Sequence, residues 1–253
     1  MIENELRWDK AKGSNVWIYG KKYIDFTSSI FSQNFGHSNP YVIKEVDKQL
    51  DKCLHAYGYS TEIKEKYLSK LKEMIGYKNI LLFSTGSEAT EATIKIVNYN
   101  KYKAIGMSNA MHGRTLGAEI LNGKRPKYDI SSIYNIDRWD YIPSKIENND
   151  KAIFIEGYRG YDCKLLESQD IGKLKVYQEQ GNLIVFDEIQ SGFYRTNNMF
   201  TYYQEYVIEP DILLIGKSMG GGFPLSAVCY NKDFNIEGIE LTSTHSGDRK
   251  SVV

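Results

Sequence analysis

The sequence predicts an α/β fold in which helices cover both faces of a mostly parallel sheet. Beyond residue 76, five short apolar runs alternate with stretches of helical periodicity, a pattern typical of strands buried under helices. The runs occupy residues 80–83, 104–107, 152–155, 183–186 and 212–215. Polar residues follow each run directly, which indicates that the strands deliver them to one ligand-binding crevice at their carboxyl ends. These residues are Ser84 to Glu88, Ser108 to His112, Glu156, Asp187 and Lys217.

Turn and capping residues predict the N-terminal elements. Residues 15–26, NVWIYGKKYIDF, are expected to form a β-hairpin with its turn at the Gly-Lys pair. A helix is expected to begin at Asn39-Pro40, because the apolar residues that follow recur at helical spacing. A second helix is expected after Thr61, and Gly76 ends it.

Composition and charge argue against a general attraction to nucleic acid or to anionic membranes. The 253-residue chain has 32 basic and 32 acidic residues, and 42% of it is hydrophobic, as in a soluble globular protein. Its three scattered cysteines suit a reducing compartment. No apolar segment resembles a signal peptide or reaches membrane-spanning length. We therefore expect a cytoplasmic protein.

Two nucleotide-binding motifs and a metal site can be set aside. Lys217 after a strand resembles the lysine of a phosphate-binding P-loop, but that motif needs glycine where Asp211 stands. No G-x-G-x-x-G sequence follows a strand, so dinucleotide binding is not indicated. The four histidines lack metal-ligand spacing, so no metal is expected.

The polar residues at the strand ends meet the needs of pyridoxal 5'-phosphate. This carbonyl cofactor needs an amine for attachment and a carboxylate beside its pyridine nitrogen, and Lys217 and Asp187 provide them. Its phosphate favours the backbone amides and hydroxyls of a helix N-terminus. Thr85, Gly86 and Ser87 provide these groups where the helix SEATEATIKIVNY begins. A capping box at Ser87-x-x-Thr90 would be incomplete, which favours phosphate binding over plain capping.

Four segments together resemble the class III aminotransferases, the group of ornithine, acetylornithine and 4-aminobutyrate aminotransferases. The segments are FSTGSEATEATIK, MHGRTLGA, VFDEIQSGFYRT and PDILLIGKSMGGGFPLSAV. They occur in the family's order, and the resemblance extends from about Asp9 to Gly247. It implies the fold type I of pyridoxal-phosphate-dependent transferases, with an incomplete small domain.

The resemblance also implies roles for individual residues. Lys217 would attach the cofactor and move a proton during catalysis, and Asp187 would pair with the pyridine nitrogen. Further cofactor contacts are implied for Thr85, Gly86, Ser87, Met111, His112, Glu156 and Gln190. Thr244 is similar to a threonine that contacts the phosphate of the neighbouring subunit. The resemblance therefore implies a homodimer with shared active sites.

Several positions depart from the family's pattern. Met111 stands where an aromatic residue usually stacks on the cofactor, although a thioether can also cover a ring face. Gly157 and Tyr161 replace a proline and a glutamate, and in several members that glutamate controls an arginine that binds a substrate carboxylate. These departures leave the identity of the second substrate open.

The implied activity is the transfer of an amino group from an amino acid or ω-amine to a keto acid or aldehyde by a ping-pong mechanism. An aminomutase of the glutamate-semialdehyde type, or a chain that binds cofactor without turnover, are the alternatives. Residues 1–40 are expected to belong to the small domain, residues 41–247 to the large cofactor-binding domain, and residues 248–253 to an atypical tail. Because the family's pattern continues beyond this point, we expect a missing C-terminal part and leave the activity of the shortened chain open.

Overall fold

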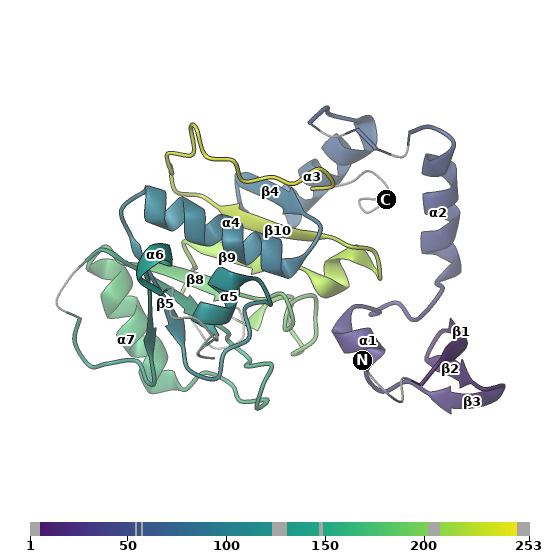
Figure 1. The fold of residues 1–253 in the computed structure, drawn as a ribbon, viewed down its shortest axis with the longest axis horizontal. Helices are drawn as coiled ribbons and strands as arrows, with labels where there is room; N and C mark the ends of the chain where they lie inside the picture. Colours follow the sequence, from purple (N-terminus) through teal and green to yellow (C-terminus); the bar gives the residue numbers. More distant parts are fainter. Residues whose placement is uncertain are drawn as a thin grey trace.

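A seven-stranded sheet forms the centre of the computed structural model, which describes residues 6–53, 55–56, 58–122, 131–146, 149–201 and 208–246. Its strand order is β4-β10-β9-β8-β7-β5-β6 (Figure 1). The strands are β4 (Asn79–Phe83), β5 (Lys103–Met107), β6 (Ile136–Trp139), β7 (Lys151–Ile155), β8 (Leu183–Asp187), β9 (Ile212–Ile215) and β10 (Ser226–Tyr230). All five predicted apolar runs are therefore confirmed as strands.

The sheet is mostly parallel, as predicted. Strands β5 to β9 pair in parallel, whereas β10 runs antiparallel to both β4 and β9. β6 was not predicted, because this edge strand has a single buried residue, Ile136, and so lacks a continuous apolar run. The parallel arrangement brings the carboxyl ends of most strands to the same edge of the sheet.

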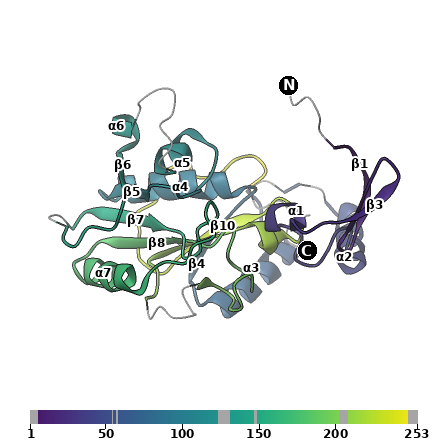
Figure 2. The ribbon, with the colours of Figure 1, turned by 90° about the horizontal axis from the view of Figure 1, so that it is seen from below.

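Helices cover both faces of this sheet (Figure 2). α4 (Gly86–Tyr99), α5 (Leu116–Leu121) and α6 (Ser131–Tyr134) lie on one face, and α3 (Glu62–Ile75) and α7 (Ser168–Glu179) on the other. Successive side chains of β8 alternate between the two cores: Leu183 and Val185 pack on the α4 side, and Ile184 and Phe186 on the α3 side. The sheet is thus buried from both sides, which explains the continuous apolar runs.

A separate three-stranded antiparallel sheet lies at the N-terminal end of the chain. Its strands are β1 (Trp8–Lys12), β2 (Asn15–Ile18) and β3 (Lys21–Ile24). The predicted hairpin is confirmed as β2 and β3, but its turn lies at Tyr19-Gly20, one residue before the predicted pair, because Lys21 already pairs with Ile18. β1 was missed because its sequence, WDKAK, is largely polar and exposed. α1 (Ser28–Phe31), a single turn whose residues have positive φ angles, then leads towards α2 (Pro40–Leu50).

Side-chain caps set the predicted helix boundaries. The Asn39 side chain accepts hydrogen bonds from two backbone amides of the first turn of α2. The Thr61 side chain accepts one from Lys64 N at the start of α3, and Gly76 ends that helix with φ 75°. Both helices therefore begin where the sequence predicted, and α3 also ends there.

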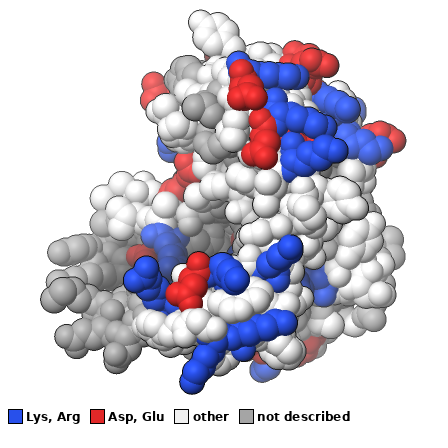
Figure 3. Space-filling model, turned by 90° about the vertical axis from the view of Figure 1, so that its right-hand side faces the viewer, with Lys and Arg blue, Asp and Glu red and all other residues white. Residues whose placement is uncertain are grey.

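Charges of both signs are mixed on the surface. Figure 3 shows acidic and basic side chains beside one another on the side of the molecule that carries the N-terminal sheet and α2. Among the described residues, none of the helices combines the length and apolarity needed to span a bilayer. The described part of the chain likewise contains no cluster of three or more His, Cys, Asp or Glu residues that could hold a metal ion.

Candidate active site

The polar residues that follow the strands meet around a cavity of about 650 Å³. Most of the predicted site residues line it directly: Thr85, Gly86, Ser87, Met111, His112, Gln190 and Lys217. Glu156 and Asp187 are buried directly behind this lining, with 5% and 4% of their surface exposed. The structure therefore brings nine of the ten predicted residues together, and Thr244 is the exception described below.

One side of the cavity is formed by the N-terminus of α4. Thr85 caps this helix: its hydroxyl accepts from Glu88 N at 3.2 Å, and the Glu88 carboxylate accepts from Thr85 N at 2.9 Å. The expectation of an incomplete capping box at Ser87 and Thr90 was wrong, because the helix is capped two residues earlier, by Thr85, and the box with Glu88 is complete. The Thr85 hydroxyl therefore caps the helix, and Gly86 and Ser87 of the first turn line the cavity.

Gly86 keeps the space above this helix end open. A Cβ atom at this position would lie 2.9 Å from Cδ1 of Ile189, which also lines the cavity. The glycine therefore lets the helix N-terminus and the Ile189 side chain approach the same small volume. Such a cradle of amides beside an apolar side chain suits a phosphate attached to a flat ring.

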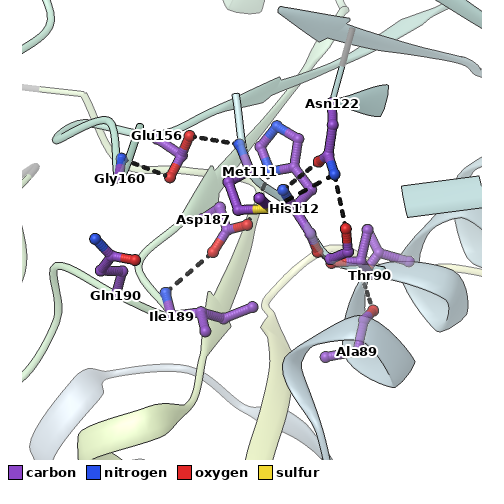
Figure 4. A network of polar contacts seen from close by, with 12 residues as sticks. Ala89, Thr90, Met111, His112, Asn122, Glu156, Gly160, Asp187, Ile189 and Gln190 are labelled. Carbon is purple, nitrogen blue, oxygen red and sulfur yellow. Dashed lines mark hydrogen bonds and ion pairs between the residues drawn. The ribbon is translucent and has the colours of Figure 1, made fainter. Parts of the chain in front are cut away.

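Asp187, the last residue of β8, supplies the central carboxylate (Figure 4). Its Oδ1 accepts a hydrogen bond from Ile189 N at 3.0 Å, and its Oδ2 lies 2.8 Å from Nδ1 of His112. Burial lowers the pKa of His112, but the contact with Asp187 and the charge of Glu156 raise it above its ordinary value. Nε2 of His112 is buried and has no hydrogen-bond partner among the described residues.

Glu156, which follows β7, holds two loops of the site. Its carboxylate accepts hydrogen bonds from Met111 N at 2.8 Å and Gly160 N at 3.1 Å (Figure 4). Burial is the main reason why the pKa of Glu156 is raised, and the nearby Asp187 raises it further. In this structure Glu156 thus acts through the backbone of the residues that line the cavity.

Lys217 is separated from β9 by Gly216 and starts the short helix η2 (Lys217–Gly220). Its Nζ donates a hydrogen bond to Oε1 of Gln190 at 2.6 Å. Burial lowers the pKa of Lys217 below its ordinary value, although the charges of Asp187 and Glu156 oppose this. A lysine with a lowered pKa offers a neutral, nucleophilic amine more readily.

The backbone at Lys217 is strained. Its φ is 45°, in the left-handed region that lysine rarely adopts, which costs on the order of 1–3 kcal/mol. With this backbone conformation the Lys217 side chain lines the cavity, and its amine donates a hydrogen bond to Gln190. Strain of this kind is typical of residues that a site positions for chemistry.

Residues outside the cavity have different surroundings. Thr244 is exposed, on a turn whose neighbours contact the start of α4: Ser243 Oγ donates to Glu88 Oε1 at 2.7 Å, and Ser84 Oγ donates to His245 O at 2.8 Å. Arg195, in the loop after β8, also lies outside the cavity. Its guanidinium contacts Asn34 and lies 4.8 Å from the ring of Phe31, so Arg195 links this loop to the N-terminal segment. The tail, residues 248–253, lies outside the described residues.

Two residues of the site, Thr90 and Asn122, were missed in the sequence. Thr90 Oγ1 donates to the carbonyl of His112 at 2.7 Å, and the side chain of Asn122 binds the backbone of the same segment. Neither residue follows a strand, and although Thr90 lies within the segment FSTGSEATEATIK, no contact with His112 was assigned to it. The sequence shows each of them as a polar residue within an apolar helical stretch, which predicts a buried side chain but not the group that it binds.

The arrangement fits pyridoxal 5'-phosphate. The cavity has an amine at one side, a buried carboxylate, and the amides of a 14-residue helix at another side. Nε2 of His112, which has no partner in the described part of the chain, is a further polar group in this environment. Lys217, Asp187, Gly86 and Ser87 would hold the amine-reactive, pyridine and phosphate ends of the cofactor.

Known proteins resemble this chain over almost its whole length. The family profile described as aminotransferase class-III matches residues 3–157 and 171–250. The acetylornithine aminotransferase of Methanosarcina mazei is 32% identical over 94% of this chain, and the succinylornithine transaminase of Photorhabdus laumondii is 34% identical over 87%. The crystal structure of ornithine aminotransferase from Toxoplasma gondii superposes with a TM-score of 0.86 at 25% identity, over 98% of this chain.

These relatives are longer than the chain. The matched part spans 64% of the M. mazei protein, 59% of the P. laumondii protein and 64% of the T. gondii chain. The expectation of a fold type I architecture that corresponds to part of the full-length proteins is confirmed by these matches.

Proposed function

The chain belongs to the class III aminotransferases, and we propose that it acts as a pyridoxal-phosphate-dependent aminotransferase. It would move an amino group from an amino acid or ω-amine to a keto acid or aldehyde by a ping-pong mechanism. The observation that carries this proposal is that Lys217 lines the same cavity as the N-terminus of α4, close enough to Asp187 for its charge to act on the amine. An ornithine aminotransferase of Toxoplasma gondii, 25% identical, has partial occupancy of PLP at its active site.

The cofactor, when bound, supplies an electron sink for negative charge on the substrate carbon beside the amine. Asp187 would keep the pyridine nitrogen protonated, because a buried carboxylate stabilises a positive charge next to it. Gly86 and Ser87, in the first turn of α4, would hold the phosphate.

Lys217 would attach the cofactor and, once freed, would hold the proton that leaves the substrate carbon. Burial lowers the pKa of its amine below the ordinary value, which favours the neutral form that a general base needs. Gln190 orients the amine through its 2.6 Å hydrogen bond. A general base of this kind contributes roughly 10²- to 10⁴-fold to the rate.

The substrate class follows from the relatives. The M. mazei and P. laumondii proteins are named for acetylornithine and succinylornithine, in both of which ornithine carries an acyl group. We therefore propose the ω-amine of an acylated ornithine as the first donor to test, with a keto acid as acceptor. The departures at Gly157 and Tyr161 are a reason to include a panel of acceptors.

The setting of the activity is part of the same proposal. We propose a cytoplasmic homodimer in which Thr244 contacts the phosphate of the neighbouring subunit. Residues 1–40 would belong to the small domain and residues 41–247 to the large cofactor-binding domain. Support comes from the exposed position of Thr244 and from the separate sheet of the N-terminal strands.

The test begins with the purified chain and added pyridoxal phosphate. We expect the visible absorbance of a lysine-bound cofactor, its loss in Lys217→Ala, and its retention in Lys66→Ala, which changes an exposed lysine of α3. Amino transfer from acetylornithine should fall by about 10²-fold or more in Lys217→Ala. An unchanged spectrum in Lys217→Ala would contradict the proposal. Cofactor binding without turnover in the wild type would favour the binding alternative, and turnover without any acceptor would favour an aminomutase.

A further inference from the structure

The segment of residues 111–113 belongs to no helix or strand; His112 is buried, and Met111 and Gly113 are partly buried at the cavity wall, so its backbone needs side-chain partners. Asn122 provides two of them (Figure 4). Its Oδ1 accepts the hydrogen bond of His112 N, and its Nδ2 donates to the carbonyl of Gly113 at 2.7 Å. Nδ2 also lies 3.6 Å from Sδ of Met111. One side chain thus contacts all three residues of the segment.

His112 is held from three sides as a result. Asn122 binds its backbone N–H, Thr90 of α4 donates to its carbonyl at 2.7 Å, and Asp187 of β8 lies 2.8 Å from its Nδ1. The ring also packs edge-on against Phe154, with centroids 5.9 Å apart. Because its backbone is fixed at both polar groups, the imidazole has little freedom to turn away from Asp187.

The position of Asn122 is set by close packing of α5. Asn122 is the C-cap of this helix and is 3% exposed. A Cβ at Gly106 of β5 would lie 2.2 Å from the carbonyl oxygen of Leu121, so the glycine is needed for the end of α5 to press against the strand. At its other end, α5 is bound to α4 through the hydrogen bond from Gly117 N to Glu91, 2.7 Å long.

The chemistry of this position requires a carboxamide. The side chain must accept from an N–H and donate to a carbonyl at the same time, which an asparagine does with its two ends. An aspartate would keep the acceptor but, when ionised, could not donate to Gly113. A leucine of similar size would leave the N–H of His112 and the carbonyl of Gly113 without this partner.

We propose that Asn122 is a positioning residue of the active site: it holds residues 111–113 so that the His112 imidazole donates to Asp187 while Met111 stays at the cavity wall. This inference rests on the proposed function, because it gives Asp187 the task of meeting the pyridine nitrogen. Asn122 touches neither the cavity nor the amine, and it acts through His112.

The test compares Asn122→Leu with a matched control, Asn182→Leu. Asn182 is also a buried asparagine that accepts from one backbone N–H, that of Lys151, and donates to one carbonyl, that of Tyr177, both at 3.1 Å. It lies at the opposite end of the strands from the cavity, before β8. Both variants should lose similar stability towards urea, so stability alone cannot produce a difference at the site.

Two readouts separate positioning from plain structure. In the cofactor-free chain, the ¹⁵N signals of the His112 ring should report a single Nδ1-protonated form in the wild type and in Asn182→Leu, and a mixture of forms in Asn122→Leu. Binding of pyridoxal phosphate should weaken roughly 10- to 100-fold in Asn122→Leu, and by less than threefold in the control. Asn122→Asp, which keeps the acceptor for His112 N, should fall between the two and serves if the leucine variant does not fold.

The proposal is overturned if Asn122→Leu, or Asn122→Asp in its place, keeps the wild-type ring signals and cofactor affinity. It is also overturned if the control changes both readouts equally. Failure of the proposed function would look different: the wild type itself would not bind pyridoxal phosphate, while the ring signals of His112 would still respond to Asn122.

Discussion

The seven-stranded sheet and the N-terminal segment of this chain differ in how they are held together. Every residue of β8 and β10 is buried, whereas β3 is exposed along its whole length and β1 along most of it. Several large apolar side chains of the N-terminal segment are also exposed, among them Ile24, Phe26, Phe35 and Tyr41. The sheet region therefore carries its own core, and the N-terminal segment buries little apolar surface within this chain.

Polar contacts hold the N-terminal segment instead. Asp25 and His37 lie 2.7 Å apart, and Ser218 Oγ donates to the carbonyl of Phe31 at 2.8 Å. Contacts of this kind each contribute about 1 kcal/mol, far less than a buried core. The candidate active site lies in the region that has the core, because close packing there can hold side chains in fixed positions.

The largest expected effect comes from a matched pair of phenylalanines, one in each region. Phe186 of β8 is fully buried and Phe26 is 90% exposed. Phe186→Ala should lower the free energy of unfolding by about 3–5 kcal/mol, because it leaves a cavity in the core. Phe26→Ala should change it by less than about 0.5 kcal/mol. Urea unfolding followed by circular dichroism measures both.

An equal loss in the two variants would break the comparison. It would mean that Phe26 is covered in solution, for example by a second copy of the chain. Repeating the urea titration at tenfold lower protein concentration would then reveal whether the coverage depends on association.

The N-cap residues of α4 and α2 allow the same comparison between the two regions, with a smaller expected change in stability. Thr85 caps α4, which packs on the sheet, and Asn39 caps α2, in which Val46 is the one buried residue of the described helix. Thr85→Ala should lower the free energy of global unfolding by about 1 kcal/mol, and Thr85→Ser should restore most of it. Asn39→Ala should leave the global transition unchanged and speed hydrogen exchange in α2, since this helix can open locally. A change of the global transition in Asn39→Ala would show that α2 unfolds together with the sheet.

The smallest effect concerns two carboxyl groups whose pKa values move in opposite directions. Burial raises the pKa of Asp25, but hydrogen bonds from Thr27 and the contact with His37 outweigh it and lower the pKa to about 2. Burial raises the pKa of Glu156 above its ordinary value of 4.5. Asp25 therefore stabilises the folded chain above pH 3.8, and this contribution is lost as the pH falls towards 2. For Glu156 the sign is opposite: ionisation of its carboxyl group lowers the stability of the folded chain as the pH rises above 4.5.

Hydrogen exchange between pH 6 and pH 2, corrected for intrinsic rates, tests this contrast. Amides of β2 and β3 should lose protection as the pH falls, and those of β7 should keep it. In Asp25→Asn the N-terminal amides should be less protected at pH 6, with little further dependence on pH. A pH dependence in Asp25→Asn as steep as in the wild type would assign the acid sensitivity to another group.

The sequence predicted the parts of the fold that depend on local pattern. The strands around Ile153, Val185 and Leu214 are continuous apolar runs because helices cover both of their faces, so their prediction needed no knowledge of neighbours. β1 and β6 were missed because edge or exposed strands carry mixed residues, and their pairing depends on contacts distant in the sequence. The capping box at Thr85 was missed because its position depends on where α4 begins.

The site was predictable to the extent that motifs place residues after strands. Asp187 ends a strand of the sheet, and Glu156 and Lys217 follow others, so their meeting at one edge follows from the fold. Asn122 and Thr90 could not be found in this way, since their role is to satisfy the backbone of a segment whose path the sequence does not reveal. The strain at Lys217 is likewise a property of the folded chain.

The central claim is that the amine of Lys217 and the carboxylate of Asp187 serve one bound pyridoxal phosphate. Incubation with the cofactor, reduction with borohydride and peptide mass spectrometry identify the lysine to which it is attached. The account predicts a single major adduct on the peptide that contains Lys217, and its strong reduction in Asp187→Ala. Labelling spread over surface lysines, or an adduct at Lys217 that is indifferent to Asp187, would contradict it.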